Sequence, residues 1–198
     1  MLKTSKAKLL RLSVHGQNPT VYEYAEAREI WAEHEQTEKT NLFSRVGIGA
    51  RGAKFGVYRP GDIPLHDAIL HHGQHYFLTN INQTEPAAAE ISAALVRVEG
   101  CSMKKSVVTG KDAYNRPVSE EREIMQFPGI LTEKYLRWAQ ELPQATTQIT
   151  YVLVTPKPVR LKVGDLVRVG ETDIYNVRAC HVLDDWKNEY EIVLEDDA

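Results

Sequence analysis

Three absences narrow what this 198-residue chain can be. It has only two cysteines, Cys101 and Cys180, so neither a disulfide framework nor a cysteine-rich metal site can be built. No apolar run approaches the roughly 20 residues that span a bilayer, and no charged-then-apolar leader opens the sequence. With 42% hydrophobic and 26% charged residues, the composition is that of a soluble globular protein. We expect it to be made and used in a cytosol.

The chain also lacks an excess of positive charge. Its 24 Lys and Arg residues are outnumbered by 27 Asp and Glu residues, for a formal net charge of −3. This balance argues against a general nucleic-acid binder. Neither half shows the basic, aromatic face that a small-molecule or single-strand-binding barrel would need. A ligand-binding barrel therefore stays only as a minor alternative.

Residues 57–81 predict a β-meander. Aliphatic and aromatic residues gather in three short runs, separated by turns that contain Pro60-Gly61 and Gly73; the runs are 57–58, 68–70 and 76–81. Runs of this kind between glycine-containing breaks are typical of short antiparallel strands. The rest of the chain is best organised around this stretch.

A similar pattern returns in residues 158–179. Aligning Asp67 on Asp165 gives an offset of 98, since 165 − 67 = 98, and the same offset places Tyr76 over Ile174. A fixed offset between two similar segments indicates an internal repeat, in which one β-unit occurs twice in the chain.

Further strands are predicted where β-branched and apolar residues alternate. These runs are 9–14, 92–99, 106–109, 124–127, 148–154, 159–161 and 190–194. Residues 20–38 stay open between helix and strand, because their composition favours a helix while their apolar positions keep no 3.6-residue stripe. The clearest helix is expected at 132–142, between the capping Thr132 and Pro143.

Together these patterns predict a mostly β fold of two tandem units, residues 1–100 and 101–198, each a small β-barrel or sandwich. One or two short helices are expected, the second being a turn or two near residues 87–90. Long loops are expected at 43–53 and 131–148. Loops of this length in a compact domain are usually functional.

Nothing in the sequence commits it to catalysis. A cluster of His66, His71, His72 and His75 suggests zinc, but adjacent histidines in a strand point to opposite faces, and the second unit keeps none of them. The glycines of residues 47–56 lack the lysine and the strand-to-helix setting of a phosphate-binding loop. We therefore expect no enzyme activity, no cofactor and no metal, and we interpret the three tryptophans as core or interface anchors.

The first unit resembles the head-tail joining, or head-closure, proteins of long-tailed bacteriophages. The resemblance covers residues 10–100 and lies in the order and spacing of four segments: 30–33, 54–61, 68–69 and 73–81. It implies a small β-barrel that forms a cyclic homo-oligomer in the neck, as a stopper-like connector. The implied partners are a portal-side adaptor and a tail-side terminator or tube protein, with passage of DNA through the lumen and no membrane.

This resemblance predicts a virion protein that passes through the host cytoplasm during assembly. Another virion β-protein, such as a tail-completion, terminator or minor capsid component, would share the same features and stays open. Aromatic residues set among glycines and charges make good interface anchors. The expected interface residues are Phe43, Ile48, Arg51, Leu131, Tyr135 and Trp138.

Overall fold

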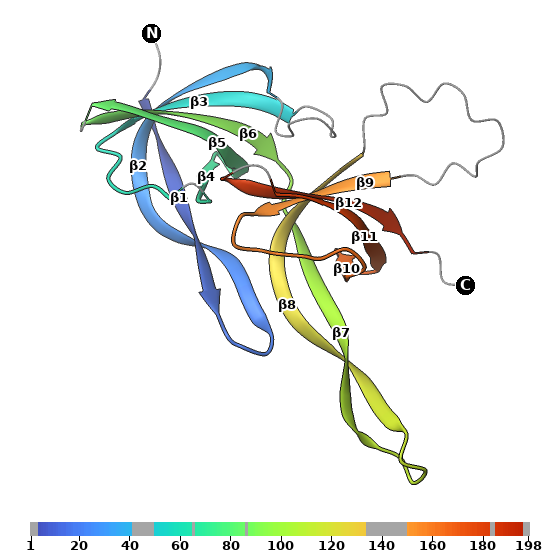
Figure 1. Ribbon diagram of the computed structural model, residues 1–198. Helices are drawn as coiled ribbons and strands as arrows, with labels where there is room; N and C mark the ends of the chain where they lie inside the picture. The colour runs from blue at the N-terminus through green and yellow to red at the C-terminus, as the bar shows by residue number, and fades with distance from the viewer. Residues whose placement is uncertain are drawn as a thin grey trace, which may run out of the picture.

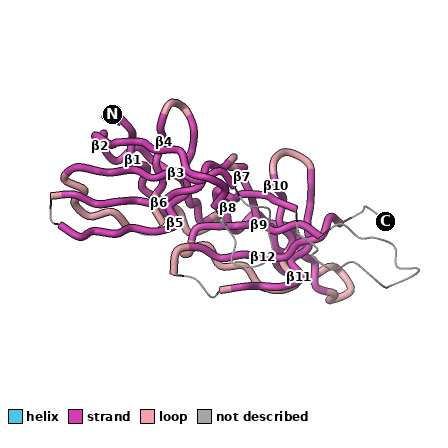
Figure 2. The backbone as a smooth tube through the Cα atoms, turned by 90° about the horizontal axis from the view of Figure 1, so that it is seen from above, coloured by secondary structure: helices cyan, strands magenta, loops and turns pink. Residues whose placement is uncertain are grey.

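The computed structural model describes residues 4–40, 50–64, 66–85, 87–133, 150–182 and 185–195. Within these ranges all helix or strand structure is β, in twelve strands, as Figure 1 and Figure 2 show. The prediction of a mostly β protein is therefore confirmed. The described residues hold no helix that could span a membrane.

The first six strands form a closed ring. Hydrogen bonding runs in the order β1-β4-β5-β6-β3-β2, and β2 pairs back with β1, so the ring has no free end. All six pairings are antiparallel. The strands are β1 (Thr4–His15), β2 (Thr20–Thr40), β3 (Ala50–Tyr58), β4 (Ala68–His71), β5 (Gln74–Glu85) and β6 (Ala88–Val96).

The last six strands form a second ring with the same connectivity. Their order is β7-β10-β11-β12-β9-β8, closed by the pairing of β8 with β7, and it reproduces the first ring strand for strand. These pairings are also antiparallel. The strands are β7 (Glu99–Lys111), β8 (Pro117–Glu133), β9 (Thr150–Pro156), β10 (Leu166–Val169), β11 (Asp173–His181) and β12 (Lys187–Leu194).

The rings lie side by side (Figure 1), and both backbone pairing and buried side chains join them. A short parallel pairing of β2 with β8 makes one continuous twelve-stranded sheet, although it involves only Thr20 with Met125 and Val21 with Gln126. A small apolar cluster draws from both rings; its buried members are Phe77, Ala94, Ile130, Val152 and Val154.

Even the irregularities of the two rings correspond. Ala27 of β2 is an extra residue opposite Leu9 and Leu10, and Ile124 of β8 is an extra residue opposite the equivalent pair of β7. A second bulge leaves Thr79 unpaired in β5 and Arg178 unpaired in β11. Because bulges bend a strand and re-aim its side chains, matched bulges give the two rings the same curvature at the same points.

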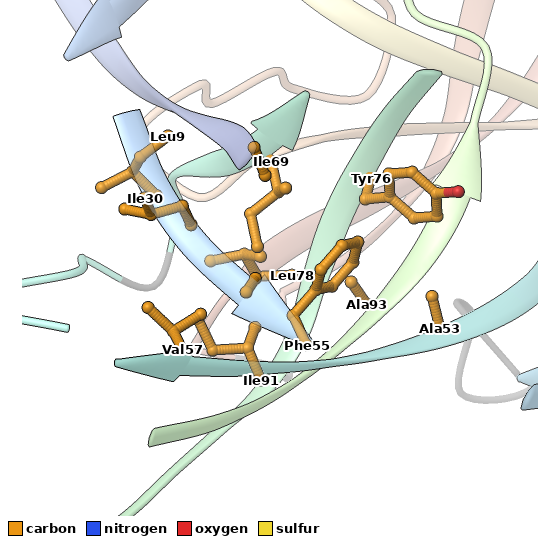
Figure 3. Packing of buried hydrophobic residues seen from close by; sticks show 12 residues of the cluster. Leu9, Ile30, Ala53, Phe55, Val57, Ile69, Tyr76, Leu78, Ile91 and Ala93 are labelled. Atoms are coloured by element: carbon orange, nitrogen blue, oxygen red, sulfur yellow. The ribbon is translucent and has the colours of Figure 1, made fainter. Parts of the chain in front are cut away.

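Matched positions also fill the two cores. Each ring encloses one cluster of buried side chains, and in the first ring Phe55 packs edge-on against Tyr76 with ring centroids 5.0 Å apart (Figure 3). By their pairing registers, nine positions of the two clusters are equivalent: Ala7 and Cys101, Leu9 and Met103, Ile30 and Phe127, Phe55 and Leu153, Ile69 and Val167, Tyr76 and Tyr175, Leu78 and Val177, Ile91 and Tyr190, Ala93 and Ile192.

The predicted offset of 98 holds for β4 and β10 but not for the strand that follows. The turn from β4 to β5 has two residues, whereas the turn from β10 to β11 has three. The offset therefore becomes 99, and Tyr76 is matched by the buried Tyr175 rather than by Ile174, which is 36% exposed. The sequence alignment was wrong by one residue because it allowed no insertion in the turn.

Three local predictions are corrected. Residues 20–38, which the sequence left open between helix and strand, belong to strand β2, and residues 88–90 of the helical turn expected near 87–90 belong to strand β6. Pairing of β2 with β1 and then with β3 along its length, and of β6 with β3 and β5, overrides the helix propensity of their Ala and Glu residues. Thr132 and Glu133 end strand β8 instead of opening a helix, and the remainder of that predicted helix lies outside the described residues. The loops expected at 43–53 and 131–148 are correspondingly shortened, since 50–53 and 131–133 are strand.

Residues 159–161, predicted as a strand, instead form an irregular segment held against the second core. The hydroxyl of the fully buried Tyr190 donates to Val159 O at 3.0 Å and accepts from Leu161 N at 3.1 Å. The Asn188 side chain donates to the same Val159 oxygen at 2.6 Å. Side chains thus supply the hydrogen bonds that a strand neighbour would otherwise give.

Gly129 offers a direct test of core packing in the second ring. A Cβ at this position would lie 2.6 Å from Cys101 Sγ and 2.8 Å from Leu153 Cδ1. We expect Gly129→Ala to lower the free energy of unfolding by about 1–3 kcal/mol, measured by urea denaturation, because the core must shift to admit the methyl group. Gly110→Ala is the matched control, since nothing lies within 4 Å of a Cβ there. Equal stability of the two variants would contradict the packing.

Candidate protein interface

A two-stranded arm extends from the second ring (Figure 1). Strand β10 pairs with β7 only as far as Lys104, and β2 contacts β8 only at Met125 and Gln126. From there outward β7 and β8 pair only with each other, and residues 105–122 are all exposed. Both outer edges of this arm therefore carry unpaired backbone donors and acceptors, which are open to another chain.

The arm exposes apolar as well as charged side chains. Val107, Val108 and Val118 are 37%, 63% and 43% exposed, and a bulge lies between Val108 and Gly110. A hairpin that packs on nothing is marginally stable in water. The arm also carries charged side chains, including Glu120 and Arg122, which lie 3.5 Å apart. Such charges oppose non-specific edge-to-edge pairing with other strands, but they do not cover the three valines. The arm therefore leaves apolar side chains and unpaired backbone edges exposed together.

The tip of the arm is a rigid turn, residues 111–117. Asp112 Oδ1 accepts hydrogen bonds from the backbone N–H groups of Tyr114 and Arg116, both at 2.8 Å. Asn115 takes the left-handed conformation with φ 65°, which asparagine tolerates well. This turn presents Tyr114, which is 82% exposed, the largest value among the large apolar side chains of the described residues.

A groove lies where the two rings meet, at the base of the arm. Its volume is about 700 Å³, and its walls come from β2, from the adjoining parts of β7 and β8, and from the turn between β10 and β11. The lining includes the carboxylates of Glu23, Glu99, Glu123 and Glu171 beside a single arginine, Arg168. The groove is therefore acidic, and the arm that starts beside it points away.

Of the six expected interface residues, two lie in the part of the chain that the structure describes. Arg51 is exposed and pairs with Lys39 where β2 and β3 extend beyond the ring. Leu131 is half-buried, packs against the second core cluster and lies opposite Leu153. Its packing gives Leu131 a role within the chain, and a partner contact by Arg51 or Leu131 stays a prediction. Phe43, Ile48, Tyr135 and Trp138 lie outside the described residues.

Sequence reasoning misses the arm because the run at 106–109 predicts only an ordinary strand. One signal was present. Polar and charged residues occupy both alternating faces of 119–123, where a strand packed on a core would keep one face apolar. Symmetric polarity on both sides of a turn indicates a hairpin exposed on both faces.

The histidines gather more closely than their sequence positions suggest. His71 ends β4 and is buried, with Nε2 2.8 Å from Ser5 Oγ, and its ring lies 4.7 Å from that of His34. His72 was expected to point to the opposite face, but it occupies a turn with φ 49° and its ring centroid lies 4.1 Å from that of His71. Within the described ranges no group of three or more His, Cys, Asp or Glu residues is arranged to hold a metal ion.

Burial sets the charge state of this cluster. It lowers the pKa of His34 and of His71 from the ordinary 6.5, and the neighbouring His72 lowers both further. The pKa of His75 is lowered by burial alone. Asp67 lies apart from the cluster, fully buried with Oδ2 3.5 Å from Arg11 Nε. Its pKa is raised by burial, against the opposing effect of Arg11.

The lowered histidine pKa values predict a loss of stability in mild acid. Below 6.5 the unfolded chain takes up protons that the folded cluster resists, so the free energy of unfolding falls as the pH drops through that value. We expect the urea midpoint of the wild-type chain to be lower at about pH 5.5 than at about pH 7.5. The double variant His34→Gln, His71→Gln should shrink this difference. The control His15→Gln, which removes an exposed imidazole, should leave it in place.

The tryptophans fall into different roles. Trp31 is 54% exposed, with Lys6 Nζ 5.6 Å from the centre of its ring, so it is not a core residue. Trp186 is partly buried against the first core cluster although it belongs to the second half of the chain. Trp138 lies outside the described residues. Trp186 thus helps to fix the two rings together.

Comparisons of the chain with family models, with curated proteins and with solved structures found no match.

The arm is expected to be dispensable for folding. Replacing residues 106–121 by Asn-Gly, which would join the paired Lys105 and Arg122 through a tight turn, should leave the free energy of unfolding within about 0.5 kcal/mol of wild type. The reason is that the removed residues are exposed and contribute nothing to either core. Circular dichroism and urea denaturation measure the outcome. An unfolded product would show that the arm is part of the folding unit.

Proposed function

We propose that this chain is a structural protein of a bacteriophage neck, which forms a cyclic homo-oligomer at the junction of head and tail. The observation that carries the proposal is the exposed arm of residues 105–122, which projects from a strand ring that is otherwise closed. Closed rings have no sheet edges to offer a neighbour. The arm is therefore the part of the described fold best suited to join subunits.

The proposal includes the tandem architecture. We infer that each ring is a small β-barrel unit and that the two arose by duplication. Identical strand order, two matched bulges and nine equivalent core positions support this inference. The first unit is the one whose sequence resembles head-tail joining proteins, so the second is a copy that carries the longer arm.

A structural role also agrees with how the ring interiors are used. Barrels that hold a small ligand keep an internal cavity, whereas small filled barrels use their inward side chains as a core. Here large buried residues fill both interiors, including Phe55 in the first and Tyr190 in the second. This filling disfavours the ligand-binding alternative. It does not distinguish a neck connector from a tail-completion or minor capsid protein, which would have the same construction.

In the neck, one face of the oligomeric ring of subunits would contact a portal-side adaptor, and the other face would contact a tail-side terminator or tube protein. Identical subunits that contact head to tail close into a ring when the rotation between them permits. The lumen of such a ring would let DNA pass, without any base-specific contact by this chain. We propose no catalytic step for it.

Electron microscopy of intact particles tests the proposal. We expect cyclic density for this chain at the junction of head and tail, and labelling of the chain with an antibody or a fused tag should mark the same position. Particles made without the chain should be heads and tails that fail to join. Density at the tail tip, or a chain found only free in infected cells, would rule out the neck assignment.

A further inference from the structure

The tip of the arm and the groove between the rings complement each other in charge. The groove lining has four glutamates and one arginine. Glu99 is already paired with Arg97 at 2.8 Å, so the balance is −2 with His75 neutral. The tip carries Lys111 and Arg116 against Asp112 alone, a balance of +1, and Asp112 is already engaged by the turn. The same molecule therefore carries a cationic tip with a projecting tyrosine and, elsewhere on its surface, an acidic groove that complements it.

Two residues of the groove lining carry a polar atom that lacks a partner. Arg168 and His75 both line the groove, and Arg168 Nε and His75 Nδ1 are buried without a hydrogen-bond partner. A buried donor left unsatisfied costs free energy. A hydroxyl group entering the groove could accept from Arg168 and interact with the imidazole. Tyr114 offers such a group at the end of an apolar ring.

The tip cannot reach the groove of its own chain. Glu123 and Ser102 line the groove and also form the base of the arm, so the arm grows away from it. From Lys104 to Asp112 the strand rises by about 26 Å, at roughly 3.3 Å per residue. Continuous pairing from Lys104 with Glu123 to Lys111 with Pro117 keeps the arm extended over this distance.

We propose that the arm tip of one copy, with Tyr114 as its anchor, docks into the groove of a second copy. This inference rests on the ring-forming role proposed above and names the surfaces that would join its subunits. The contact is heterologous, because one subunit gives its tip and the next gives its groove. Repeated contacts of this kind close into a ring or continue as a filament. The turn at the tip is already ordered, so little conformational freedom is lost on docking.

Sedimentation velocity on the full-length chain tests this contact. We expect the weight-average sedimentation coefficient of the wild-type chain to rise with concentration up to roughly 1 mM, the range in which weak association becomes visible. Tyr114→Ala should weaken the association at least about tenfold, as expected for an aromatic anchor. A wild-type chain that stays monomeric over this range would overturn the proposal.

Charge reversal then locates the two surfaces. The tip variant Lys111→Glu, Arg116→Glu and the groove variant Glu23→Lys, Glu171→Lys should each fail to self-associate. A mixture of the two variants should regain association. The wild-type tip of the groove variant can dock into the wild-type groove of the tip variant, and the reversed tip also complements the reversed groove. This rescue also shows that both variants are folded. The control Arg160→Glu, Arg178→Glu reverses two exposed cations outside tip and groove and should behave as wild type.

The outcomes separate this contact from the proposed function. Tip and groove variants that associate like wild type would overturn the contact, even if particles show the chain in the neck. Association that follows the charge-reversal pattern supports the contact, even if the chain is later found elsewhere in the virion. Binding of the tip variant by a different virion protein, with unchanged self-association, would assign the arm to that partner and overturn docking between copies.

Discussion

The closure of each strand ring is the constraint on which the rest of the structure depends. The pairing of β1 with β2, and of β8 with β9, gives every ring strand two neighbours and brings its alternate side chains onto one enclosed core. Twelve strands would otherwise present long open edges. Closure also determines which residues lie outside the rings. Where a strand is longer than its ring neighbours, its remaining residues can pair only with its hairpin partner. The arm of β7 and β8 is formed in this way.

The sequence predicted the class of structure and many of its strand positions, because short β-branched runs between glycine turns depend on local chemistry. It could not decide where distant residues determine the outcome. Residues 20–38 form a strand because β1 pairs with the first part of the segment and β3 with the last part, and nothing within the segment encodes those neighbours. The one-residue insertion before Asp173 was equally invisible, since a turn of three residues and a turn of two read alike without the pairing register.

The interface could be predicted from the sequence only in part. Glycine-rich and aromatic segments drew attention to residues near 43–53 and 131–148, whereas the structure directs it to the hairpin of β7 and β8. The difference is that exposure is a property of the whole fold. Tyr114 has an unremarkable sequence context, and its 82% exposure follows from the length of the hairpin and the turn that Asp112 stabilises.

Gly129 marks a position at which the two cores differ in side-chain size. Its equivalent in the first ring is Ala32, which is fully buried, as read from the pairing of Ser5 with Ala32 and of Glu99 with Gly129. A methyl group at Gly129 would meet Cys101 Sγ and Leu153 Cδ1, and these residues stand where the first core has Ala7 and Phe55. The two halves share one strand order, but a residue moved from one core to the other meets different neighbours, so the exchange of a single core residue requires its neighbours to shift.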